Sequence, residues 1–165
     1  MCCKTLFVPE ISKAPDVWCK HCKIGEGCTI YAERPQSCRD FDCQYLRSAD
    51  IAEHWKPAHS RMVISLFKNR VCVHVDPDRS DAWRREPYHS DLREWAANAA
   101  PGGGVIAVYV GYDLTVVLPD RDVSLGRVGD QHVIRLSKWL GTNGIEYDPV
   151  LLKPGDPRLR VRPQA

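Results

Sequence analysis

The sequence has no long apolar segment and no marked excess of charge of one sign. Its 165 residues include 23 Lys and Arg and 21 Asp and Glu, which gives a formal net charge of +2. No apolar run approaches the roughly 20 residues of a membrane-spanning helix, and the first residues lack the pattern of a signal peptide. Basic residues gather only near the C-terminus, at Lys153, Arg158, Arg160 and Arg162. We therefore expect a cytoplasmic protein whose partners include neither a membrane nor a nucleic acid.

Recognisable catalytic motifs are absent too. The histidines His54, His59, His89 and His132 are scattered and form no HExxH pair. The glycine run 102–104 follows a predicted helix and lacks the GK[ST] ending of a phosphate-binding loop. The sequence therefore indicates no catalytic residue, and we favour a binding protein over an enzyme.

Cysteine, in contrast, is abundant and clustered. Seven of the eight cysteines lie in the first 43 residues, and five of these follow the spacing C-x2-C-x5-C-x9-C-x4-C from Cys19 to Cys43. In a reducing compartment, such clustering indicates metal binding or catalysis and not a set of disulfides. A borderline-soft ion such as zinc, or the iron of an iron-sulfur cluster, prefers thiolates, and a C-x2-C turn supplies two of them to one ion. The pattern predicts a metal site.

The predicted partner of these cysteines is a metal ion. The segment contains more thiols than one ion requires. Cys2 is a further candidate, although adjacent side chains rarely both reach one tetrahedral ion. One zinc with spare thiols, a four-iron cluster with spares and a shared two-metal site all remain open. His21, inside the C-x2-C turn, is an alternative ligand. The principal candidate ligands are Cys3, Cys19, Cys22, Cys28, Cys38 and Cys43.

The remaining pattern predicts one helix near the cysteines and an α+β domain after them. Pro35 can begin a helix over 35–48. Alternating apolar residues predict strands over 61–67 and 70–75, joined at Lys68-Asn69. Cys72 lies in the second of these strands and is expected to be a small buried hydrophobe without a metal.

Further along, helical spacing predicts a helix over 89–100, capped by Ser90. The following strands are expected over 105–110, 114–119, 123–125 and 132–140, with the last two paired through a turn at 127–130, and an edge strand over 145–152. Hairpin-length connections make the sheet mainly antiparallel. The predicted fold class is α+β: a cysteine-rich metal-binding segment over 1–48, packed on an α+β domain over 49–165 in which one helix covers the sheet.

Four sequence elements carry a resemblance to a known family: CCK at the start, WCKHC, GCTIY and RPQSCRDFDC. Together they resemble the bacterial YkgJ-like cysteine-cluster proteins, which are described as zinc- or iron-chelating. The resemblance covers the segment from Cys2 to Leu46, about a quarter of the chain. It implies metal binding and no particular reaction.

The leading hypothesis is a metal-binding protein with one structural Zn²⁺ held by four thiolates, because a closed shell leaves no position for water or substrate. A second hypothesis is an iron-sulfur enzyme or redox component. A third is a metal chaperone or sensor that exchanges its ion.

Overall fold

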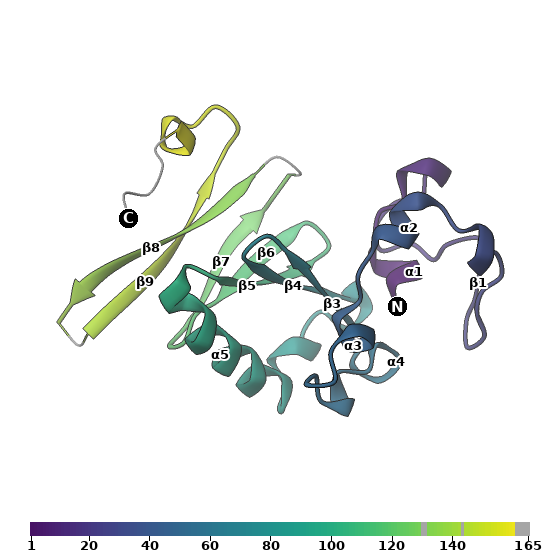
Figure 1. The fold of residues 1–165 in the computed structure, drawn as a ribbon, viewed down its shortest axis with the longest axis horizontal. Helices are drawn as coiled ribbons and strands as arrows, with labels where there is room; N and C mark the ends of the chain where they lie inside the picture. Colours follow the sequence, from purple (N-terminus) through teal and green to yellow (C-terminus); the bar gives the residue numbers. More distant parts are fainter. Residues whose placement is uncertain (130–131, 143, 161–165) are drawn as a thin grey trace.

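The computed structural model describes residues 1–129, 132–142 and 144–160. The cysteine-rich segment lies at one end of the molecule, a five-stranded sheet occupies the middle, and a long two-stranded hairpin lies at the other end (Figure 1). Asp130 of the predicted turn and Arg162 of the basic C-terminal stretch lie outside the described residues. Within those residues, no helix has the length and apolar character needed to cross a membrane. The α+β fold class is confirmed.

The central sheet contains five strands in sequence order. They are β3 (Met62–Phe67), β4 (Arg70–Val75), β5 (Val105–Val110), β6 (Asp113–Val117) and β7 (Asp122–Arg127). Neighbouring strands are antiparallel except for β4 and β5, which are parallel. A parallel pair needs a crossover connection, and the segment between these strands supplies one that contains helix α5. The predicted β3–β4 hairpin is confirmed.

Helix α5 (Tyr88–Ala99) covers one face of the sheet (Figure 1). Its Leu92 and Ala96 are buried against residues that include Ile64, Val73 and Ile106. The predicted helix is confirmed, but the cap is not. The helix begins at Tyr88 after Pro87, and Ser90 lies inside its first turn, where its hydroxyl donates to the carboxylate of Glu86.

The opposite face of the sheet packs, over β5 to β7, against the hairpin of β8 (Val133–Gly141) and β9 (Gly144–Leu152). Here Ala107, Val116 and Ile134 belong to a second core. The predicted pairing of 123–125 with 132–140 is wrong, because β7 pairs with β6 and β8 pairs with β9. The nine-residue β8 and β9 pair with each other along their whole length. The short edge strand predicted over 145–152 is therefore one strand of a separate two-stranded hairpin.

The cysteine-rich segment is built from short elements. Its helices are α1 (Cys2–Thr5), α2 (Gln36–Asp40) and α3 (Gln44–Arg47), and its strands are β1 (Cys22–Lys23) and β2 (Gly27–Cys28). Helix α4 (Pro57–Ser60) follows the segment.

Single 3₁₀ turns occur along the described part of the chain, at Pro9–Ile11, Tyr31–Glu33, Glu53–Trp55, Pro77–Arg79, Ala82–Arg84, Ala100–Gly102 and Pro157–Arg160.

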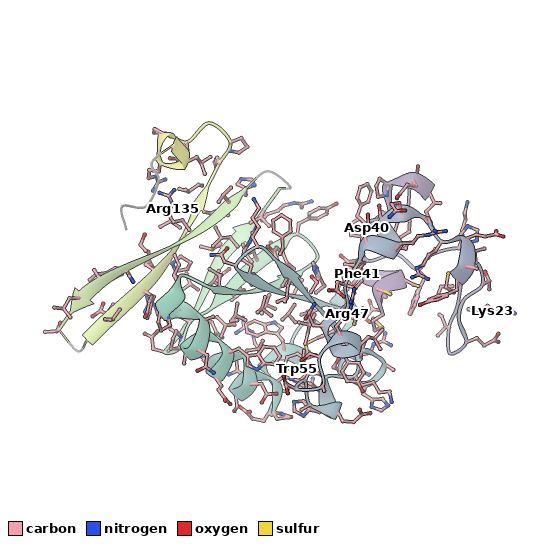
Figure 2. All side chains as sticks on the ribbon, viewed as in Figure 1. Lys23, Asp40, Phe41, Arg47, Trp55 and Arg135 are labelled. Atoms are coloured by element: carbon pink, nitrogen blue, oxygen red, sulfur yellow. The ribbon has the colours of Figure 1, made fainter. Side chains whose placement is uncertain are left out.

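The continuous helix predicted over 35–48 is wrong. It breaks into α2 and α3, because Phe41 and Cys43 both adopt extended backbone conformations, with ψ of 118° and 111°. Local side-chain bonds hold the two pieces: Gln36 Nε2 donates to Asp40 Oδ1 at 2.6 Å, and Arg47 Nε donates to Asp42 Oδ1 at 2.6 Å. The break places Phe41 at the junction between the cysteine-rich segment and the sheet (Figure 2).

Candidate metal centre

The C-x2-C pair and Cys28 form a compact hairpin, residues 19–28, which we call the cysteine knuckle. Cys22 and Cys28 are paired opposite each other in the β1–β2 ladder, and the Cys22 N–H donates to the Cys19 carbonyl at 2.9 Å. Gly25 and Gly27 turn the chain with φ of +90° and +118°, values that side-chain-bearing residues rarely adopt. This turn places Cys28 opposite Cys22.

Helix α1 brings the N-terminal cysteines to the knuckle. The Cys19 N–H donates to the Cys3 carbonyl at 2.9 Å. The Cys3 thiol also lies within hydrogen-bonding reach of the thiols of Cys2 and Cys22. The adjacent pair Cys2-Cys3 is therefore joined to the C-x2-C turn by both backbone and side-chain contacts.

A cavity of about 330 Å³ connects these thiols with the two cysteines that come later in the chain. Its lining includes apolar side chains such as Val8, Ile11 and Ile30, together with His21. Cys22 does not line it directly but contacts Cys3, which does. Six cysteines line the cavity, from α1, the knuckle, α2 and the residue before α3: Cys2, Cys3, Cys19, Cys28, Cys38 and Cys43.

The thiols lie close enough to influence one another's ionisation. A hydrogen bond from Cys3 lowers the pKa of Cys2 to about 6, whereas that same bond, burial and the negative charges of Cys2 and Cys22 raise the pKa of Cys3. Burial raises the pKa of Cys38, and the charges of Cys2, Cys19 and Cys28 raise it further. Several thiolates in one cavity therefore repel one another, and a bound cation would relieve that repulsion.

Arg34 and Arg39 donate hydrogen bonds to backbone carbonyls. Arg39 donates from Nε to the Arg34 carbonyl at 2.9 Å and from Nη2 to the Ala32 carbonyl at 3.1 Å. Arg34 lies over the Tyr31 ring, 4.0 Å from its centroid. These contacts fix the loop that precedes α2 and so position Cys38.

A buried ion-pair network fastens α1 to the sheet. Lys4 Nζ lies 2.6 Å from Asp76 Oδ1 and 2.5 Å from Asp78 Oδ2, and Arg61 Nη2 lies 2.5 Å from Asp76 Oδ2. The Lys13 ammonium donates to the Lys4 carbonyl at 2.5 Å and so closes the segment around Lys4. Lys4 directly follows Cys3, so the network holds one wall of the cysteine cavity against the end of β4. The sequence patterns did not predict it.

All eight cysteines are free thiols, and six of them line one cavity. Thiolates are the donors that zinc and iron prefer. Across residues 1–129, 132–142 and 144–160, no group of three or more His, Cys, Asp or Glu side chains is arranged around a common point as metal ligands. Cys72 lies apart from the cavity, buried in β4, as predicted.

Comparisons of the chain with protein-family models, with curated proteins and with solved structures give no match.

Proposed function

We propose that the protein binds a thiophilic metal ion through its N-terminal cysteines, in the simplest form one structural Zn²⁺ held by four thiolates. The observation that carries the proposal is the gathering of six cysteines from four short segments around one cavity. Packing alone gives no reason for such convergence, because Val8 is the one buried hydrophobic residue in residues 1–48 and it lies outside these four segments. The resemblance of Cys2 to Leu46 to the YkgJ-like cysteine-cluster proteins supports the same conclusion.

The knuckle and α1 supply the four thiols that we assign to the ion: Cys3, Cys19, Cys22 and Cys28. These four are linked by the β1–β2 register, by the backbone bonds of Cys19 and by the contact between Cys3 and Cys22. When bound, the ion would contribute folding free energy by joining short elements that cannot form a core of their own.

A second candidate is an iron-sulfur cluster, because cysteine thiolates are also the ligands of such clusters. Cys38 and Cys43 line the cavity as well, so it has more thiols than either one tetrahedral zinc or one four-iron cluster requires. Cysteines of the same cavity would hold an iron-sulfur cluster, and the cluster would supply redox chemistry.

Serine substitution in the knuckle tests the proposal. We expect Cys19→Ser and Cys22→Ser each to lose most of the roughly one metal ion per chain, because a serine hydroxyl is a poor substitute for a thiolate. Cys72→Ser is the matched control, since its thiol lies outside the cavity, and we expect it to keep the metal. Elemental analysis of the three purified variants measures the outcome, and circular dichroism checks that the sheet is folded. Full metal retention in both knuckle variants would contradict the proposal.

A further inference from the structure

A second and larger cavity, of about 680 Å³, lies over the part of the sheet that neither α5 nor the β8–β9 hairpin covers. Strands β3, β4 and β5 form its floor, the β8–β9 hairpin and the segment after β7 contribute one side, and residues near α1 and α2 the other. We call it the sheet cleft. Its volume lies within the range of about 300–1,000 Å³ that is typical of small-molecule sites.

Strand alternation places a set of polar side chains on this floor. Arg70, Cys72 and His74 occupy alternate positions of β4, so their side chains share one face. Ser65 is the cross-strand partner of Cys72, and Tyr109 is the register partner of His74 on β5. All five residues line the sheet cleft.

These side chains hold one another in fixed positions. The rings of His74 and Tyr109 are stacked, with centroids 5.4 Å apart and planes 15° apart. Ser65 Oγ lies 3.4 Å from His74 Nε2. The Arg70 guanidinium lies near the Tyr109 hydroxyl and over the Phe67 ring, 5.0 Å from the centroid.

The lining of the sheet cleft carries one guanidinium, that of Arg70, on the floor and two carboxylates, those of Asp40 and Asp42, on the wall. In the described part of the chain, Arg70 forms no ion pair with a carboxylate, whereas Asp42 is paired with Arg47 and Asp40 accepts a hydrogen bond from Gln36 Nε2. Burial lowers the pKa of His74 to about 4, so this imidazole is neutral at physiological pH. The floor of the cleft therefore offers one guanidinium without an ion-pair partner, beside neutral hydrogen-bonding groups.

The wall and rim around this guanidinium are aromatic. Phe67 and Tyr112 line the cleft while their side chains remain largely exposed, at 52% and 47%. Phe41, at the junction shown in Figure 2, lines the opposite wall. Flat apolar groups next to a guanidinium suit a ligand with a flat apolar body and a carboxylate, which arginine binds through two parallel hydrogen bonds.

We propose that the sheet cleft binds a small aromatic carboxylate, with the carboxylate on Arg70 and the ring system against Phe67 and Tyr112. Ser65, His74 and Tyr109 supply neutral hydrogen-bonding groups for further polar atoms of the ligand. The sheet cleft adjoins the cysteine cavity, and Leu6, Phe7 and Phe41 line both. None of the cysteines that line the cysteine cavity lines the sheet cleft.

A pair of isosteric probes tests the charge requirement. We expect the full-length protein, as purified, to bind 2-naphthoate at least about tenfold more tightly than neutral 2-naphthamide, because the carboxylate forms charge-assisted bonds with Arg70. Calorimetric titration with each probe gives the two dissociation constants. Equal affinity for the two probes, or no binding of 2-naphthoate at millimolar concentration, would overturn the proposal.

Substitutions at Arg70 locate the site. Arg70→Gln should abolish the preference for 2-naphthoate, and Arg70→Lys, which keeps the charge but loses the bidentate geometry, should retain part of it. Arg79→Gln removes the same charge from an exposed residue outside the cleft and should bind both probes as the parent does. A preference that persists unchanged in a folded Arg70→Gln variant would place the binding elsewhere and refute the assignment.

Discussion

Replacing Asp76 by alanine is expected to lower the free energy of unfolding by about 3–5 kcal/mol, the usual cost of removing one partner from a buried ion pair. The Asp76 side chain is fully buried, and the Lys4 side chain is only 6% exposed. Burial disfavours the Asp76 carboxylate, but bonds donated by Lys4, the Asp78 N–H and Arg61 outweigh it and lower the pKa. Without Asp76, the buried Lys4 keeps one ion-pair partner, the exposed Asp78.

Asp78→Ala is the matched control for this prediction. Asp78 contacts the same ammonium, but its side chain is 74% exposed, so its loss should cost less than about 1 kcal/mol. Urea unfolding of the parent and both variants gives the comparison. Equal losses in the two variants would show that the buried network does not fasten α1 to the sheet.

Trp55→Ala should also destabilise the protein by about 3–5 kcal/mol, because a buried aromatic side chain leaves a large cavity. Trp55 is 1% exposed and stacks on Trp95 with ring centroids 5.0 Å apart. Its Nε1 donates to Asp91 Oδ2 at 2.7 Å, which links the segment after α3 to helix α5. Figure 2 shows Trp55 on the side of the sheet that α5 covers.

Trp139→Ala provides the comparison for Trp55, since this tryptophan on β8 is 45% exposed. Its replacement should change the free energy of unfolding by no more than about 0.5 kcal/mol. Chemical unfolding followed by circular dichroism measures both variants. A loss below about 1 kcal/mol for Trp55→Ala would contradict the core position assigned to it.

The sequence predicted correctly those elements whose pattern lies within one short stretch of the chain. The β3–β4 hairpin follows from two alternating apolar runs around Lys68-Asn69, and α5 follows from its helical spacing. The pairing of β8 with β9 could not be predicted from such a local pattern. Whether β8 pairs with β7 or with β9 depends on how Ile134 and its neighbours pack in the second core.

The arrangement of the cysteines was harder to predict from the sequence than the sheet. The sequence does carry a local signal for the pairing of Cys22 with Cys28, because Gly25 and Gly27 mark a tight turn between them. The break between α2 and α3 could not be predicted, because the side-chain bonds of Asp42 and Arg47 compete with a helical pattern that looks continuous.

The sheet cleft was missed for a different reason. Ser65, His74 and Tyr109 come from three different strands, and only the register brings their side chains together. The alternation of Arg70, Cys72 and His74 with valines was the signal that could have found the floor of the cleft.

Elemental analysis and a visible spectrum of one anaerobically purified sample test the central claim most directly. The proposal predicts about one zinc per chain and no absorbance near about 400 nm, where iron-sulfur thiolate transitions occur. Iron with sulfide and a brown colour would establish the iron-sulfur alternative and contradict the zinc assignment. A sample that contains neither metal, and takes up neither when supplied with them, would contradict metal binding by the cysteine cavity altogether.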